Sequence, residues 1–260
     1  MFFPEWSKIR VGFLLSFLLL SLLYSAYQLT YSRNWGAPLD VVIYPIAADG
    51  KTSVQDYIDG LNDAKFRSID HWMSEQAKAH GLPNPQPVAT RMGMQITEQP
   101  PEFPAKPEPW SILMWGLRMR WWSTFYTPND PDLSWRSVKI YVVYHKGEPN
   151  KALPHSLGLQ KGLIGLVHAF ATPAQSAQNN VVIAHELLHT VGATDKYDNY
   201  GSPLFPIGYA NPNRVPLHPQ RSAEIMAGRI PVSRYDSVMA HSLRSSTIGP
   251  LTAEEINWPK

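Results

Sequence analysis

A run of 22 uncharged residues near the N-terminus, residues 11–32, restricts the topology of this chain more than any other feature. As a helix that rises about 1.5 Å per residue, it would span roughly 30 Å, the thickness of the hydrocarbon core of a bilayer. We expect an uncleaved transmembrane signal anchor. A cleaved signal peptide is the alternative, but residues 22–27 lack the small-residue pattern typical of a cleavage site.

The charges that flank this run predict its orientation. Lys8 and Arg10 precede it, and only Arg33 follows closely. Because basic residues are enriched on the cytoplasmic side, we expect a cytoplasmic N-terminus and an exported remainder, in the periplasm if the source is a bacterium with two membranes. Aromatic side chains suited to the interfacial belts lie near both ends of the run, at Trp6, Tyr24, Tyr27, Tyr31 and Trp35.

The length of the chain, 260 residues, allows one substantial core and a tether. We therefore expect a cytoplasmic stub and anchor over residues 1–33 and a single domain over residues 34–260. The 23 basic and 21 acidic residues are spread along the chain without a long basic run, so nucleic acid is not an expected partner. There is no cysteine, so any metal must be held by nitrogen and oxygen.

Beyond the anchor, the spacing of apolar residues predicts strands and helices in alternation. The expected helices cover residues 53–80 and 110–125, and the expected strands cover residues 41–46, 88–97, 138–144 and 163–170. This order indicates an α+β fold with an α/β-like N-terminal lobe, in which helices back a twisted sheet. Arg118 and Arg120 interrupt the aromatic helix, so we expect it to be buried against the sheet rather than to contact the membrane a second time.

The C-terminal part has a different character. Residues 199–221 are rich in proline, glycine and asparagine, which predicts an irregular lobe on the surface. Residues 251–256 predict a final helix with Thr252 as its cap.

The motif that carries chemistry is HELLH at residues 185–189, within an apolar segment over residues 181–191. Asn179 and Asn180 offer an N-cap, so we expect this segment to be a helix. His185 and His189, four residues apart, project from the same helix face and can reach one cation. Glu186 can contact a water bound to that cation, which assigns it the role of general base.

A catalytic zinc ion takes three protein ligands and a water, so a third ligand must be found. Gly192 can adopt a positive φ, end the helix and turn the chain back toward the histidines. Asp195 follows three residues later. We therefore expect zinc to be held by His185, His189 and Asp195.

Residues 185–198, HELLHTVGATDKYD, resemble the HExxHxxGxx signature of metzincin peptidases. The form with aspartate in the third place is similar to that of snapalysin-type peptidases, and the continuation Asp-x-Tyr-Asp is similar to the motif region of immune inhibitor A-like bacterial peptidases. The resemblance implies a zincin fold, zinc as the cofactor, His185, His189 and Asp195 as its ligands, and Glu186 as the catalytic base.

The same resemblance implies two further features. One is a methionine turn beneath the metal, which we place at Met226, with Met239 as the competing position. The other is an edge strand, over residues 163–170, that binds an extended substrate by backbone pairing. Most metzincins have histidine where this chain has Asp195, so Asp198, or Glu224 in a thermolysin-like arrangement, remains an alternative ligand.

Other residues have weaker signals. A phenol that stabilises the oxyanion would come from Tyr197, Tyr200, Tyr209 or Tyr235, and the sequence does not choose among them. We expect structural or surface roles for the histidines without metal-ligand spacing, which are His145, His155, His168, His218 and His241.

Together these features predict a membrane-anchored, zinc-dependent metalloendopeptidase that acts on a protein or peptide outside the membrane. A non-catalytic accessory or binding protein that keeps a zincin scaffold is the alternative, and hydrolysis of a non-peptide amide, such as a cell-wall component, is a third. The presence of Glu186 favours the enzyme, because a purely structural metal site needs no base.

Overall fold

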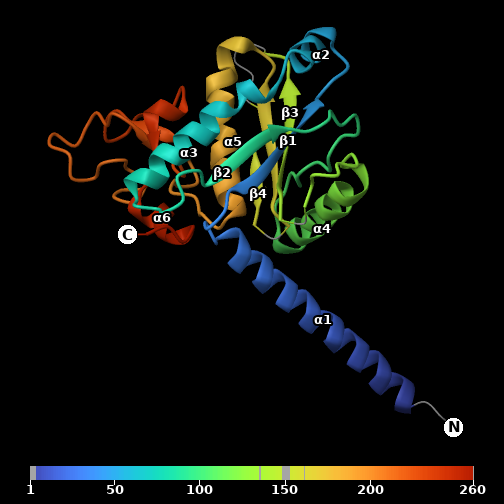
Figure 1. The fold of residues 1–260 in the computed structure, drawn as a ribbon. Helices are drawn as coiled ribbons and strands as arrows, with labels where there is room; N and C mark the ends of the chain where they lie inside the picture. The colour runs from blue at the N-terminus through green and yellow to red at the C-terminus, as the bar shows by residue number, and fades with distance from the viewer. Residues whose placement is uncertain (1–3, 135, 148–152, 161, 260) are drawn as a thin grey trace.

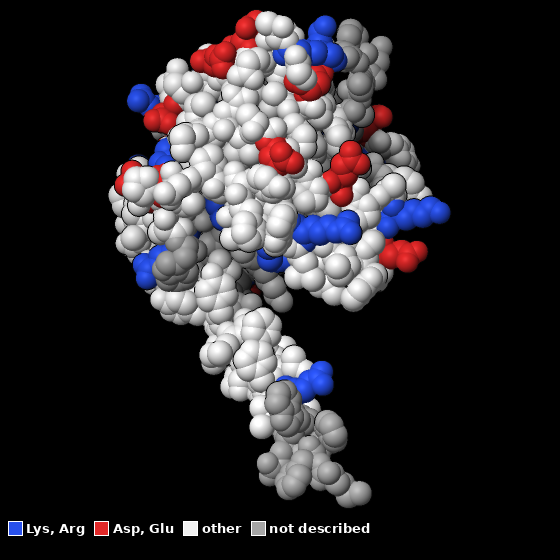
Figure 2. Space-filling model, turned by 90° about the vertical axis from the view of Figure 1, so that its right-hand side faces the viewer, with Lys and Arg blue, Asp and Glu red and all other residues white. Residues whose placement is uncertain are grey.

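The computed structural model describes residues 4–134, 136–147, 153–160 and 162–259. It is a mixed α/β domain from which the N-terminal helix α1 (Pro4–Ser32) projects (Figure 1). Residues Lys8–Ser32 of this helix are long and apolar enough to cross a membrane, as the sequence predicts. Figure 2 shows the projecting helix with an uncharged surface except near its N-terminal end.

The C-terminal turn of α1 is fixed to the domain. Gln28 and Ser32 are buried there. The backbone N–H of Gly162 donates to Gln28 Oε1 at 3.1 Å, and Arg33 Nε donates to the carbonyl of Val191 at 2.9 Å. The helix and the domain are therefore joined by side-chain contacts as well as by the chain itself.

Five strands form one sheet in the order β2-β1-β3-β5-β4. Neighbouring strands are parallel except β4, which is antiparallel to β5. The strands are β1 (Leu39–Ala47), β2 (Val88–Met92), β3 (Val138–His145), β4 (Leu157–Leu159) and β5 (Ile164–Phe170).

Two expectations about the sheet are wrong. The strand expected over residues 88–97 ends at Met92, and the strand expected over residues 163–170 is not at the edge. The edge strand on this side of the sheet is β4, which pairs residue by residue with the first half of β5, and β2 is at the opposite edge. A strand of three residues with a central glycine has no alternation of polar and apolar residues, so the sequence pattern does not reveal it.

The expectation of a single helix over residues 53–80 is also wrong. This segment consists of α2 (Thr52–Asp59), the short 3₁₀ helix η1 (Asp63–Lys65) and α3 (Arg67–Ala79). Gly60 caps the end of α2, and the Asn62 side chain accepts from the Ala64 N–H to begin η1. Asp63 Oδ1 accepts the N–H of Met92 at 2.7 Å, so the break connects these helices to the end of β2.

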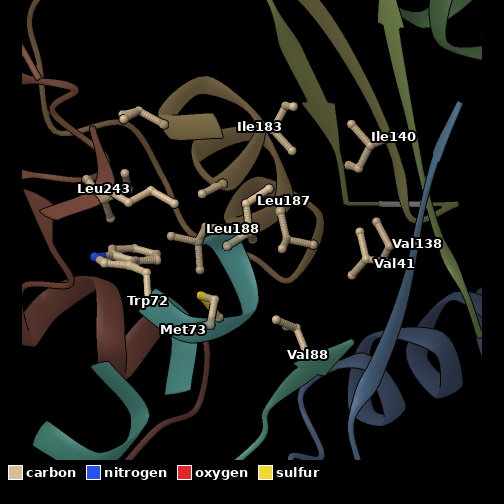
Figure 3. Packing of buried hydrophobic residues seen from close by; sticks show 14 of the residues in the cluster. Val41, Trp72, Met73, Val88, Val138, Ile140, Ile183, Leu187, Leu188 and Leu243 are labelled. Carbon is tan, nitrogen blue, oxygen red and sulfur yellow. The ribbon is translucent and has the colours of Figure 1, made fainter. Parts of the chain in front are cut away.

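Helices cover both faces of the sheet (Figure 1). On one face lie α2, α3 and α5 (Ser176–Thr190), and Figure 3 shows Ile183 and Leu187 of α5 facing Ile140 and Val138 of the sheet. On the other face lies α4 (Pro109–Tyr126), which packs Trp115, Met119 and Trp122 against the sheet. The alternation of each central strand thus supplies two cores, one on each face.

Beyond α5, the chain is mostly irregular, and residues 199–221 contain no helix or named strand, as expected. The regular elements in this part are short: β6 (Ala223–Glu224), β7 (Arg229–Pro231), β8 (Ser237–Met239), η3 (Leu243–Ser245), β9 (Ser246–Thr247) and α6 (Pro250–Glu255). A further short 3₁₀ helix, η2 (Pro173–Gln175), directly precedes α5. Strand β6 pairs with β9, and β7 pairs with β8.

Two side chains differ from expectation in this region. Helix α6 begins after Gly249, with Pro250 in its first position, so Thr252 is not its cap. The hydroxyl of Thr252 instead donates to Glu224 Oε1 at 2.6 Å. Trp35 is buried, and its Nε1 donates to the carbonyl of Ile256 at 2.7 Å, so it packs in the domain rather than in an interfacial belt.

Candidate metal site

Helix α5 carries the HELLH motif and begins earlier than expected, at Ser176. Asn179 and Asn180 are therefore inside the helix and are not its N-cap. The Asn179 amide accepts from the N–H of Phe170 and donates to its carbonyl, while Asn180 Nδ2 donates to the carbonyl of Lys65 at 2.7 Å. These bonds fix the first turns of α5 to β5 and to η1.

The apolar face of α5 gives the motif its orientation. Ile183, Leu187 and Leu188 are buried in the core between the sheet and α3 (Figure 3). Since His185 and His189 lie on another face of the same helix, burial of those three side chains turns both imidazoles away from the core and toward the C-terminal segment.

The predicted ligands come together. His185 Nε2 and His189 Nε2 are 3.1 Å apart. Asp195 Oδ1 lies 3.2 Å from the first of these nitrogens and 3.1 Å from the second. The three residues thus form a group of possible metal ligands whose donor atoms lie within 4.8 Å of one another.

The second nitrogen of each imidazole is held by a backbone carbonyl. His185 Nδ1 lies 2.9 Å from the oxygen of Ile225, and His189 Nδ1 lies 2.8 Å from the oxygen of Ala193. A carbonyl only accepts, so each Nδ1 carries a proton and Nε2 is the nitrogen of each ring that can offer a lone pair to a metal. This arrangement orients both rings and fixes the tautomer that a metal ligand needs.

The loop that carries Asp195 is fixed at several points. Gly192 has φ +106°, so it takes the expected left-handed turn after α5. Lys196 is buried, and its Nζ donates to Glu255 Oε2 at 2.7 Å. Glu255 also accepts from the N–H and the hydroxyl of Thr194. These contacts hold the residues on both sides of Asp195 and act as positioning contacts for the site.

The alternative ligands have other partners. Asp198 Oδ1 accepts from the N–H groups of Tyr200 and Ser202, which closes a turn. Glu224 is fully buried and accepts four hydrogen bonds within residues 224–252, including one from the N–H of Met226 at 2.6 Å. Neither carboxylate belongs to the group formed by the two histidines and Asp195.

Of the two candidate methionines, Met226 is the one next to a residue that hydrogen-bonds to a candidate ligand. It is fully buried and follows Ile225, whose carbonyl binds His185. The N–H of Ala227 donates to the carbonyl of Glu224 at 3.0 Å, which makes residues 224–227 a tight turn. Met239 lies on β8 and lines the neighbouring cleft.

Glu186 is buried beside the ligands. Among the described residues, no group forms a hydrogen bond with its Oε2, although that atom is inaccessible to solvent. Burial raises the pKa of Glu186 above its usual range, while the nearby His185 and His189 oppose this rise. A buried carboxylate oxygen without a partner is costly, which points to a group that binds there.

The charges of the ligands depend on one another. Burial acts to lower the pKa of His185, but its hydrogen bond with Asp195 and the charge of Glu186 outweigh this effect and raise the pKa to about 9. Burial acts to raise the pKa of Asp195, but the hydrogen bonds from both histidines hold it well below its usual range. Without a metal, a proton on His185 therefore compensates the carboxylates.

A cleft of about 640 Å³ opens beside His185 and Glu186. Tyr197 lines it, and the phenol ring stacks near His185 with ring centroids 6.4 Å apart. Burial and the adjacent Asp195 raise the pKa of Tyr197 above its usual range. Of the four tyrosines that the sequence left open, Tyr200 and Tyr235 are highly exposed and Tyr209 contacts His218, so only Tyr197 lies at the cleft with the ligands.

The edge strand lies directly against the motif helix, which the sequence did not indicate. A Cβ atom at Gly158 of β4 would lie 2.3 Å from His189 Cβ and 2.7 Å from the carbonyl oxygen of Glu186. Only glycine permits this approach. His155 and His168, for which structural or surface roles were expected, line the same cleft. Residues 148–152, which precede these lining residues, lie outside the described part of the chain.

Comparisons with protein-family models and with curated protein sequences found no significant match.

Proposed function

We propose that this chain is a membrane-anchored, zinc-dependent metalloendopeptidase with a zincin, metzincin-like catalytic domain. The observation that carries the proposal is the triangle of His185, His189 and Asp195 donor atoms, with the buried Glu186 carboxylate beside it. The order of the motif, HExxHxxGxxD, and the parallel sheet with an antiparallel edge strand beside the motif helix also support it.

The donor atoms fit zinc. With ligands about 2.0–2.1 Å from the ion, the edges of a tetrahedron are about 3.3 Å long, close to the spacing of the three donors. The donor separations in this chain are 3.1, 3.2 and 3.1 Å. Two neutral imidazoles and one carboxylate are a common ligand set for catalytic zinc, which keeps its fourth position for water.

In the proposed mechanism, His185, His189 and Asp195 would hold a zinc ion, which would act as a Lewis acid toward the scissile carbonyl and the attacking water. Glu186 accepts the proton of that water and later gives it to the leaving amine nitrogen. Its raised pKa suits both steps, because a general base works best when its pKa lies near the working pH. Tyr197 donates a hydrogen bond to the oxygen that becomes negative.

The substrate class follows from the edge strand. Strand β4 is one of the two end strands of the sheet and lies against α5, so an extended peptide that pairs with β4 would pass the site. The cleft beside His185 is lined partly by apolar side chains such as Phe170, Val181 and Met239, which would accept a side chain of that peptide. The proposed substrate is therefore a protein or peptide in extended conformation.

The proposed location is a single-pass membrane protein with α1 as its anchor. Helix α1 is long and apolar enough to cross a bilayer, and Lys8 and Arg10 lie before its apolar run. The bias of basic residues toward the cytoplasm supports an N-terminus inside and a catalytic domain outside, in the periplasm if the source is a two-membrane bacterium.

The experiment that tests this function uses the full chain in detergent and compares Glu186→Ala with the unaltered protein. We expect the unaltered protein to bind about one zinc ion per chain and to cleave a peptide library. Glu186→Ala should keep the zinc and lose at least about 100-fold in kcat, because general-base catalysis contributes roughly that much or more.

Two matched substitutions test the ligand assignment in the same assay. Asp195→Ala should lose zinc, whereas Asp198→Ala should retain it, since Asp198 closes a turn away from the donors. Hydrolysis that survives in Glu186→Ala would contradict the role of the base. Zinc binding without hydrolysis of any peptide by the unaltered chain would instead favour the accessory protein.

A further inference from the structure

Helix α4 is apolar on two opposite faces, and the domain covers only one of them. The covered face carries Trp115, Met119 and Trp122, which pack against the sheet. A helix that is apolar all round is normally buried on every side. The expectation that α4 would simply be buried against the sheet is therefore only half fulfilled.

The other face of α4 carries large apolar side chains at helical spacing. They are Trp110 (69% exposed), Leu113 (52%), Leu117 (51%), Trp121 (57%) and Phe125 (65%). At about 100° per residue, these positions form one stripe along the helix. Arg118 lies beside the stripe, and Arg120 turns back to donate to the carbonyl of Gly116. Soluble domains rarely expose so continuous an apolar surface.

Helix α4, which carries this stripe, lies close to the C-terminal end of α1. Gly162 donates its N–H to Gln28 of α1, and the Cβ position of the same glycine is 3.6 Å from Nε of Arg120 on α4. Gly162 is thus close to a side chain of each helix. Figure 1 shows α4 on the side of the domain toward which α1 projects, and Figure 2 shows mostly uncharged surface on that side of the molecule.

We propose that the outward face of α4 lies in the interfacial layer of the same bilayer that α1 crosses. Tryptophan, phenylalanine and leucine on one face are typical of helices that lie in the plane of a membrane surface, and tryptophan is enriched at that depth. The inference rests on the proposed membrane crossing of α1 and is independent of the proposed hydrolysis. Two contacts, one crossing and one in the plane, would fix the orientation of the domain on the membrane.

The natural absence of cysteine makes the test direct. Single cysteines are introduced into the full chain at Leu117 and Phe125 on the stripe and labelled with a nitroxide. The protein is placed, one copy per disc, in nanodiscs of phosphatidylcholine and phosphatidylglycerol. Collisions of each label with oxygen, which concentrates in lipid, and with a water-soluble nickel chelate are compared. Both positions are exposed, so the substitutions leave the core intact.

Two reference positions calibrate the measurement. Leu18→Cys in α1 reports the hydrocarbon core, and Val215→Cys, 93% exposed in the C-terminal lobe, reports water. We expect the labels on α4 to favour oxygen several-fold more than the label at Val215. Equal nickel access at Leu117 and Val215 would overturn the proposal.

Two further outcomes would also overturn the proposal. Access of the nickel chelate to the label at position 18 would contradict the membrane crossing of α1 and, with it, the proposed contact of α4. Spin–spin broadening from a second chain, in preparations that hold more than one copy, would assign the stripe to self-association.

Discussion

At the scale of single residues, the candidate site depends on which atom of each imidazole is left free. The carbonyls of Ile225 and Ala193 occupy both Nδ1 positions, so both Nε2 atoms point at Asp195. The same oxygen of Asp195 serves both histidines, at 3.2 and 3.1 Å. In the metal-free protein the raised pKa keeps a proton on His185, which hydrogen-bonds to Asp195, and a divalent cation would take the place of that proton.

The raised pKa of His185 predicts how zinc binding depends on pH. In the metal-free protein this pKa is about 9, above the ordinary value of 6.5, so zinc must displace a proton from His185 at neutral pH. We expect zinc affinity to increase about tenfold per pH unit between pH 6.5 and 9 for this one proton. Calorimetric titrations in buffers of different ionisation enthalpy would measure both the affinity and the proton released.

The same shift sets the stability of the metal-free protein. A folded pKa above the unfolded value gives stabilisation that is complete below about pH 6.5 and is lost as pH increases through about 9. Urea unfolding of zinc-free protein should therefore show decreasing stability across this window, and His185→Gln should remove the trend. A flat profile for the unaltered zinc-free protein would contradict the assigned coupling of His185 to Asp195.

At the scale of secondary-structure elements, the contact between β4 and α5 connects the edge of the sheet to the site. Gly158 is the point of contact, because its missing side chain lets the strand approach His189 and Glu186. A short strand is weakly specified by its own sequence, so its place depends on β5 and α5. Strand β4 is thus positioned by the helix that carries the HELLH motif.

Gly158→Ala tests this contact. The added Cβ would lie 2.3 Å from His189 Cβ, which is too close without movement of β4 or α5. Overpacking of this kind costs about 1–3 kcal/mol, and we expect a lower kcat/KM and weaker zinc binding together with the lower stability. Chemical unfolding and peptide cleavage would be measured side by side.

Gly50→Ala is the matched control for this substitution. A Cβ at Gly50 would have no neighbour within 4 Å, and its backbone is not in the left-handed region. The change should alter stability by less than about 0.5 kcal/mol. Equal effects of the two substitutions would show that the contact between Gly158 of β4 and His189 of α5 leaves room for a side chain.

At the scale of the whole molecule, helix α1 and the candidate metal site are connected through Arg33. Its Nε donates to the carbonyl of Val191 at the end of α5, two residues after His189. A cation at a helix C-terminus is favourable because it binds carbonyls that lack partners within the helix and offsets the negative end of the helix dipole. The candidate metal site is therefore close to the point at which α1 meets the domain.

Arg33→Ala tests this connection in the full chain. Loss of the charged hydrogen bond should destabilise the domain by about 1–2 kcal/mol and weaken zinc binding, because the end of α5 leads into the loop with Asp195. A chain that begins at Asn34 also lacks the Gln28 contact, so it should be less stable still. Thermal unfolding and zinc competition would quantify both effects.

Arg244→Ala provides the control for charge, since Arg244 is exposed in the C-terminal lobe. We expect it to leave both measurements unchanged. If Arg33→Ala behaved like Arg244→Ala, the contact with Val191 would have no energetic role, and the anchor would act as a tether alone.

The sequence by itself determined the features that depend on neighbours along the chain. The uncharged run predicted helix α1, and short apolar runs predicted four of the five strands of the sheet that the described residues form. The spacing of His185, His189 and Asp195 predicted one cluster. In each case the signal is local, because helix periodicity and a positive φ at Gly192 set where side chains point a few residues away.

Only the tertiary structure decided the features that depend on residues far apart. These features follow from which segments pack together. They are the edge position of β4, the helix break at Gly60, the roles of Glu224 and Asp198, the position of Tyr197 at the cleft, and the uncovered face of α4. A carboxylate has the same sequence signal whether it binds a metal or closes a turn. Its partners decide its role, and folding brings those partners from distant parts of the chain.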